Sequence, residues 1–157
     1  MRAAVVVALG CSSYVGPSNT KFVATPAYTK SPQIADRAIT VRGTDSVTSA
    51  GGKYLGIVVA DGVGSSVSVV RNAAWQAALI GGTHILLRES KVDRVDSSVA
   101  TQHTVVRGGV EQSSIAFVPV HYDEIHAVFD VFRVEPDQWS LLHPQMRPTP
   151  RAKLDRP

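Results

Sequence analysis

The central part of the chain alternates apolar and polar segments in a pattern that predicts a strand–helix–strand unit. Residues 53–61 are apolar on both alternating faces, which is typical of a strand inside a sheet. After a Gly-rich turn, residues 66–80 carry apolar side chains at helical spacing. The expected buried face of this helix consists of Val67, Val70, Ala74, Ala77 and Ala78. Gly81-Gly82 then ends the helix, because glycine readily adopts the left-handed conformation of helix C-termini, and residues 83–88 predict a second strand.

Three further apolar stretches predict strands in the second half of the chain. They cover residues 101–107, 114–120 and 127–134. Gly108-Gly109 predicts a hairpin between the first two of them. Pro119 has no backbone N–H to donate, so it belongs at a strand end or at a sheet edge. The charged, Ser-rich residues 89–100 are expected to form a loop, and residues 121–126 an exposed polar connection between strands.

Ser, Thr and Pro dominate the two ends of the chain. Residues 12–50 contain twelve Ser/Thr and three prolines, and few large apolar side chains. Segments of this composition bury too little apolar surface to offset the entropy of ordering them. We therefore expect an α+β domain at residues 51–139, with one helix packed on a mixed sheet of four to five strands. A flexible Ser/Thr/Pro-rich tether at residues 11–50 would precede it, and a Pro-rich basic tail at residues 140–157 would follow it.

The composition fits one globular domain and excludes several other classes. The chain has 157 residues, of which 44% are hydrophobic and 18% charged. A single cysteine excludes an intrachain disulfide framework. The net charge of +3 comes from basic residues that are spread along the chain or lie in the tail. A nucleic-acid binder concentrates such residues on one face or helix, so we expect no nucleic-acid partner.

The first eleven residues have the layout of an export signal. Arg2 is followed by an apolar run from Ala3 to Leu9, and then by Gly10 and Cys11. This order resembles a bacterial lipoprotein signal (residues 1–10), in which a small residue precedes the cysteine that receives lipid. The resemblance implies that acyl chains such as palmitate on Cys11 anchor the protein in a membrane. The alternative is a buried first strand over residues 3–9, since its three consecutive valines suit a strand.

A second resemblance covers residues 70–85. This segment is an Ala-rich helix that runs into Gly81-Gly82-Thr83-His84 and then a strand. It resembles small proteobacterial lipoproteins related to the Rcs envelope-stress sensor, whose domains have an Ala-rich helix, a small-residue turn and a strand. The resemblance implies a place in the cell envelope and an α+β domain. The Rcs sensor uses disulfides, which a chain with one cysteine does not offer, so its signalling mechanism is not implied.

Two short motifs contain candidate site residues. Backbone N–H groups around Gly62, Gly64, Ser65 and Ser66, between a strand and a helix N-terminus, could hold an anion. His121, Asp123 and His126 are residue types that bind zinc or a similar metal. The structural alternatives are a strand-to-helix turn with a serine cap and an exposed polar connection.

The sequence therefore predicts a non-enzymatic cell-envelope lipoprotein that acts as an interaction or structural module, with no catalytic residue and no cofactor. Its expected partners are the membrane, reached through the lipid on Cys11, and another envelope protein. Ser12 stands where an aspartate would retain a lipoprotein at the inner membrane, which favours the outer membrane, facing the periplasm or the surface. Two alternatives remain open. One is a small metal-dependent enzyme that uses His84 and residues 121–126, and the other is a soluble ligand-binding module that uses the Gly62–Ser66 turn.

Overall fold

The computed structural model describes residues 19–152, so Cys11, the predicted signal and residues 153–157 lie outside the described part. The strands are β1 (Asn19–Ala24), β2 (Ile39–Val41), β3 (Lys53–Val63), β4 (His84–Arg107) and β5 (Val110–Arg133). The helices are α1 (Asp45–Ser49), α2 (Ser66–Leu79) and the 3₁₀ helices η1 (Pro136–Leu141) and η2 (Pro144–Met146).

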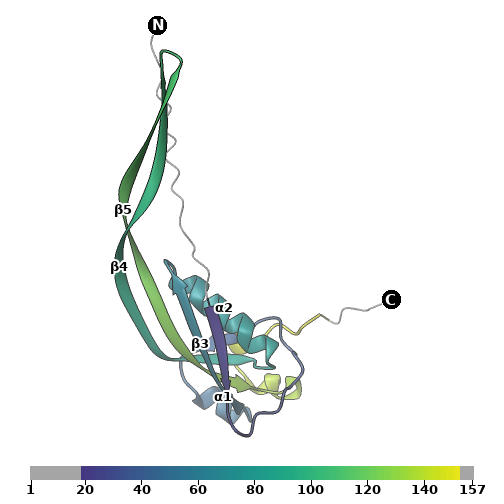
Figure 1. Cartoon of the computed structure of the whole chain (residues 1–157). Helices are drawn as coiled ribbons and strands as arrows, with labels where there is room; N and C mark the ends of the chain where they lie inside the picture. The colour runs from purple at the N-terminus through teal and green to yellow at the C-terminus, as the bar shows by residue number, and fades with distance from the viewer. Residues whose placement is uncertain (1–18, 153–157) are drawn as a thin grey trace.

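The five strands form one mixed sheet in the order β1-β3-β5-β4-β2 (Figure 1). The β2–β4 pair is parallel, and the other three pairs are antiparallel. Only α2 among the described helices is longer than two turns. This arrangement confirms the expected α+β class.

Helix α2 packs on one face of the sheet and supplies much of the main core. It begins at Ser66, and its end at Gly81-Gly82 confirms the prediction from the glycine pair. Gly81 has a φ of +88°, and the N–H of Gly82 donates to the carbonyl of Ala77 at 2.8 Å. The residues of α2 that are buried are Val69, Ala73, Ala74, Ala77 and Ala78.

The predicted buried face of α2 is confirmed at its three alanines but was wrong at Val67 and only partly right at Val70, which is half-buried, and it missed the buried Val69 and Ala73. Val67 is 73% exposed, although it points in nearly the same direction around the helix as the buried Ala74. The two residues line the same shallow groove, in which Ala74 is covered and Val67, at the first turn of α2, is not. Helical spacing alone cannot show where along a helix its cover begins.

Residues 19–50 are not a tether, which corrects the expectation for this part of residues 11–50. β1 pairs with β3 over six residues, from Asn19↔Asp61 to Ala24↔Gly56. The buried residues of the segment are Ala35, Ala38, Val41, Val47 and Ala50. Small apolar residues dispersed among Ser and Thr therefore complete the core here, so the low content of large apolar residues was misleading.

The Pro-rich segment after Trp139 also packs on the domain, as far as residue 151. Leu142 is buried in a second core cluster together with Trp139. The N–H of Asp36 donates to the carbonyl of Thr149 at 3.2 Å, and the N–H of Arg151 donates to the carbonyl of Ile34 at 3.0 Å. The expectation of an unpacked tail from residue 140 is wrong over this range, because proline prevents regular structure without preventing close packing.

The predicted loop at residues 89–100 and the predicted connection at residues 121–126 are both strand. β4 and β5 are each continuous over 24 residues and form one long hairpin. Gly108 and Gly109, with φ of +57° and +81°, make the turn between them, which confirms the hairpin prediction. Figure 1 shows this hairpin extending far beyond the rest of the sheet and twisting along its length.

Candidate functional site

The part of the β4–β5 hairpin that projects beyond the sheet, residues 94–123, is the most distinctive feature of the molecule; we call it the arm. β3 stops pairing with β5 at Val63↔Glu124, and β2 pairs with β4 only at residues 84–86. Beyond those points β4 and β5 pair only with each other, from Arg94↔Asp123 to Arg107↔Val110. The arm therefore has no third strand within the described residues.

The two faces of the arm differ in polarity, because alternate residues of a strand point to opposite faces. One face carries no Asp, Glu, Lys or Arg over residues 95–105 of β4 and 110–122 of β5, and we call it the apolar face. Its apolar residues are Val95, Val99, Val105, Val110, Ala116, Val118, Val120 and Tyr122. The other face carries charges near the base of the arm and at Glu111, together with two exposed side chains, Ile115 at 69% and Phe117 at 71%.

The three candidate metal ligands do not come together. His121 and Asp123 lie on one face of β5, and His126 lies on the other, since the odd spacing within a strand reverses the direction of the side chain. His121 Nδ1 is 2.6 Å from Asp96 Oδ1, and His126 Nδ1 is 2.5 Å from Asp61 Oδ1. Among the residues that the structure describes, no three His, Cys, Asp or Glu side chains are placed to hold a metal ion. The metal site predicted at these residues is therefore not formed.

The Gly62–Ser66 turn is partly engaged by the protein itself. Gly62 is a buried residue of β3, and the N–H of Gly64 donates to the carbonyl of Asp123 at 2.8 Å. Ser65, rather than the expected Ser66, is the N-cap of α2, and its side chain makes no capping hydrogen bond. The N–H of Gly64 is therefore already used by the base of the arm and is not available to an anion at the predicted site.

A shallow groove of about 380 Å³ lies beside this turn. It runs between α2 and the chain that leads into β2, and its lining includes Arg37, Ser66 and Arg71. Both arginines are exposed. The groove thus places two positive side chains beside the N-terminus of α2.

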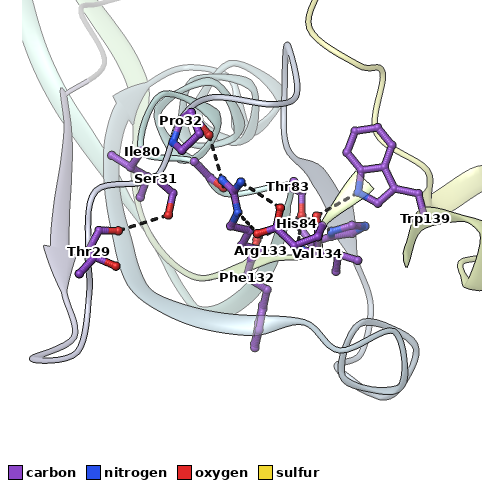
Figure 2. A network of polar contacts seen from close by, with 12 residues as sticks. Thr29, Ser31, Pro32, Ile80, Thr83, His84, Phe132, Arg133, Val134 and Trp139 are labelled. Carbon is purple, nitrogen blue, oxygen red and sulfur yellow. Dashed lines mark hydrogen bonds and ion pairs between the residues drawn. The ribbon is translucent and has the colours of Figure 1, made fainter. Parts of the chain in front are cut away.

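His84, the candidate base of the enzyme alternative, is fully buried at the start of β4 (Figure 2). Its Nδ1 lies 2.8 Å from the hydroxyl of Thr83, and its Nε2 lies 2.8 Å from the carbonyl of Met146. Burial is the main cause that lowers the pKa of this imidazole below its usual value. Both ring nitrogens have partners within the fold, so His84 joins the C-terminal segment to the sheet and has no access to a substrate.

Arg133, which the sequence analysis did not single out, is the other buried polar centre (Figure 2). Its Nη1 donates to the carbonyls of Pro32 at 2.9 Å and Gly81 at 3.0 Å, and its remaining donors contact the carboxylate of Glu135. A charged residue at the end of an apolar strand resembles an exposed strand terminus, so no sequence signal marked it. Its role in the structure is to connect three separate segments.

Comparisons with known proteins do not assign the chain to a family. Within residues 19–152, no helix has the length and apolar character needed to cross a membrane. No family model, no curated protein and no solved structure matches this chain. The arm is therefore the feature on which a functional proposal can rest.

Proposed function

We propose that this protein is a non-enzymatic interaction module of the cell envelope, in which the arm makes the contact with a protein partner. The observation that carries the proposal is a two-stranded arm with apolar side chains exposed on both faces. A hairpin of two strands is only marginally stable by itself in water, and contiguous exposed apolar surface is typical of interaction sites. A partner that covers the arm would stabilise the hairpin and bury its exposed apolar side chains.

We further propose that lipid on Cys11 holds this module at the outer membrane. The support comes from the signal-like order of residues 1–11 and from the resemblance of residues 70–85 to envelope lipoproteins. The first described residue, Asn19, pairs with Asp61, close to the end of β3 where the arm begins. An anchor at Cys11 would thus join the domain at the end of the sheet from which the arm projects.

Cell fractionation tests the anchor. The parent chain is expected in the membrane fraction, and Cys11→Ala is expected in the soluble fraction because the acyl chains that hold the protein are lost. Mass spectrometry of the membrane fraction should find a mature chain that starts at a lipidated Cys11. Identical fractionation of parent and variant would refute the anchor and the envelope placement with it.

Photo-crosslinking in the same cells tests the interaction module. A photoreactive residue at Ile115, on the arm, should give a discrete product of higher mass. The same residue at Val67, which is equally exposed on α2, is the matched control and should give none. Equal products from both positions, or no product from the arm, would show that the arm is not the contacting element.

A further inference from the structure

The two outer edges of the arm differ in their ability to pair with another strand. The carbonyl of Asp123 accepts a hydrogen bond from the N–H of Gly64, on the side of β5 away from β4. The backbone N–H and C=O of Asp123 therefore both point to the outer edge of β5. Peptide groups alternate in direction along a strand, and Pro119, four residues away, therefore faces the same outer edge. Proline has no N–H, so the outer edge of β5 lacks a donor near its middle and is a poor template for a new strand.

Among the described residues, only β2 pairs with the outer edge of β4. β2 covers it only at residues 84–86, and no proline occurs from residue 87 to residue 107. Arg94 lies directly opposite Asp123, so its peptide groups point away from β5 as well. The backbone N–H and C=O of every second residue of β4, at Asp96, Ser98 and Ala100, also point to this outer edge. No strand in the described part of the chain pairs with the N–H and C=O groups of these residues, which lie along one continuous edge.

The charged residues near the outer edge of β4 are complementary to those of a second, antiparallel copy of the same strand. Arg94 and Asp96 project from the same face, on either side of Val95. Within the described residues Arg94 makes no ion pair, whereas Asp96 contacts His121. When a strand pairs in antiparallel fashion with a copy of itself about Val95, position 94 of each copy falls opposite position 96 of the other. Both cross-copy pairs then join opposite charges.

We propose that two copies of this chain associate through the outer edges of β4, antiparallel and about a two-fold axis at Val95. Arg94 then lies opposite the partner's Asp96, and Asp96 lies opposite the partner's Arg94. This inference rests on the proposed function, because it names a second copy as the partner of the arm.

Pairing of this kind removes the weakness of the isolated arm. The two hairpins become one four-stranded antiparallel sheet, which exceeds the strand number at which a sheet with an apolar face becomes stable on its own. The apolar faces of the two arms adjoin each other, so Val95 of one copy lies beside Val95 of the other, and Tyr122 lies on the far side of each. The interface is isologous and closes after two copies, which leaves the poorly pairing β5 edges outside.

A charge swap on purified full-length chain in a Cys11→Ala background tests the pairing. The background chain should be a dimer in analytical ultracentrifugation. Arg94→Glu or Asp96→Arg alone places like charges opposite each other twice, and should weaken the dimer by about tenfold or more. The double variant Arg94→Glu/Asp96→Arg restores both attractive pairs and should recover the dimer. Glu111→Arg, with the same change of charge on β5, is the matched control and should leave the dimer intact.

A cysteine placed on the axis tests the register. Val95 is at a position where paired strands bring α-carbons to about 4.5 Å, which suits a disulfide. Val95→Cys in the same background should form a covalent dimer on oxidation. Ser98→Cys, at an exposed position of the same strand, should not, because the two copies of position 98 lie several residues apart in this register. Equal dimer from both variants would overturn the register.

The outcomes separate this inference from the proposed function. A background chain that stays monomeric at all concentrations, or a double variant no more dimeric than the single ones, overturns pairing through β4. If the background chain is monomeric and the arm crosslinks to a different protein in cells, the proposed function stands. Arm-dependent binding of the monomer to lipid vesicles would overturn pairing in favour of a membrane surface. A monomeric background chain that also gives no arm-specific crosslink would instead overturn the proposed function.

Discussion

Replacement of Arg133 by methionine should destabilise the domain by about 2–4 kcal/mol, because it removes two hydrogen bonds that no other donor replaces. Arg133 is 8% exposed at the end of β5. Its Nη1 donates to the carbonyl of Pro32 at 2.9 Å and to that of Gly81 at 3.0 Å. One side chain thus connects the segment before β2, the turn after α2 and the last residue of β5.

The magnitude follows from what each contact loses. Methionine keeps an apolar stem of similar length but has no N–H, so both carbonyls lose their partner. A buried polar group without a partner costs about 1–3 kcal/mol; the Gly81 bond is buried, and the Pro32 bond is partly buried. The ion pair with Glu135 adds little, since the side chain of Glu135 is 56% exposed and solvent screens such pairs to about 0–1 kcal/mol.

Urea denaturation, followed by circular dichroism and by tryptophan fluorescence, measures this cost. Trp139 is a suitable reporter because its Nε1–H donates to the carbonyl of Val134, next to Arg133, at 3.0 Å. Glu135→Gln is the matched control and should cost less than about 1 kcal/mol. If Arg133→Met costs no more than Glu135→Gln, the backbone contacts of Arg133 do not stabilise the fold and the argument fails.

Three further predictions concern the buried histidine, the helix and the N-terminal strand. Burial lowers the pKa of His84, so the unfolded chain binds the proton more readily than the folded chain. Stability is fully present above the ordinary histidine pKa of 6.5 and is lost as the pH falls below it. His84→Gln should flatten this slope in denaturation curves at about pH 7.5 and about pH 5. Ala77→Leu, at a position with no exposed surface, should overpack α2 against the sheet and cost about 1–3 kcal/mol in thermal unfolding, whereas Val67→Leu should leave the melting temperature unchanged. Removal of residues 1–48, compared with removal of residues 1–18, should expose the edge of β3 and cause aggregation in size-exclusion chromatography. A fragment that stays free of aggregates and is equally stable would contradict the pairing of β1.

The elements that were predictable from sequence are those in which local and tertiary preferences agree. The centre of β3 is apolar on both faces, buried on one and partly buried on the other, and α2 has an Ala-rich face that ends in Gly81-Gly82. Gly108-Gly109 marked the hairpin because each residue there adopts a positive φ. In each case the residue types that favour the local conformation also suit the burial that the fold imposes.

Prediction failed where tertiary contacts supply what the local sequence lacks. Residues 34–50 contain few large apolar side chains, yet Ala35 and Val47 are fully buried, because burial depends on what packs around a residue as well as on its size. In the β4–β5 hairpin, residues 101–107 and 114–120 were correctly predicted as strands, and prediction failed at residues 89–100 and 121–126 for the opposite reason. The strands of the arm face solvent on both sides, so the apolar periodicity that identifies a half-buried strand is weak, and the charged residues 89–96 resemble a loop.

The arm is a direct continuation of core strands, which determines how it can act. β5 is one of the two strands of the arm before it enters the body of the domain. From Ile125 onward, alternate side chains of β5 pack in the core below α2, and Phe129 there is fully buried. β3 flanks β5 up to the base of the arm, where Asp61 contacts His126 across the two strands. The direction in which the arm leaves the domain is therefore fixed by the main core. A partner meets an edge that is already extended, and association loses less conformational entropy than it would with a free loop of the same length.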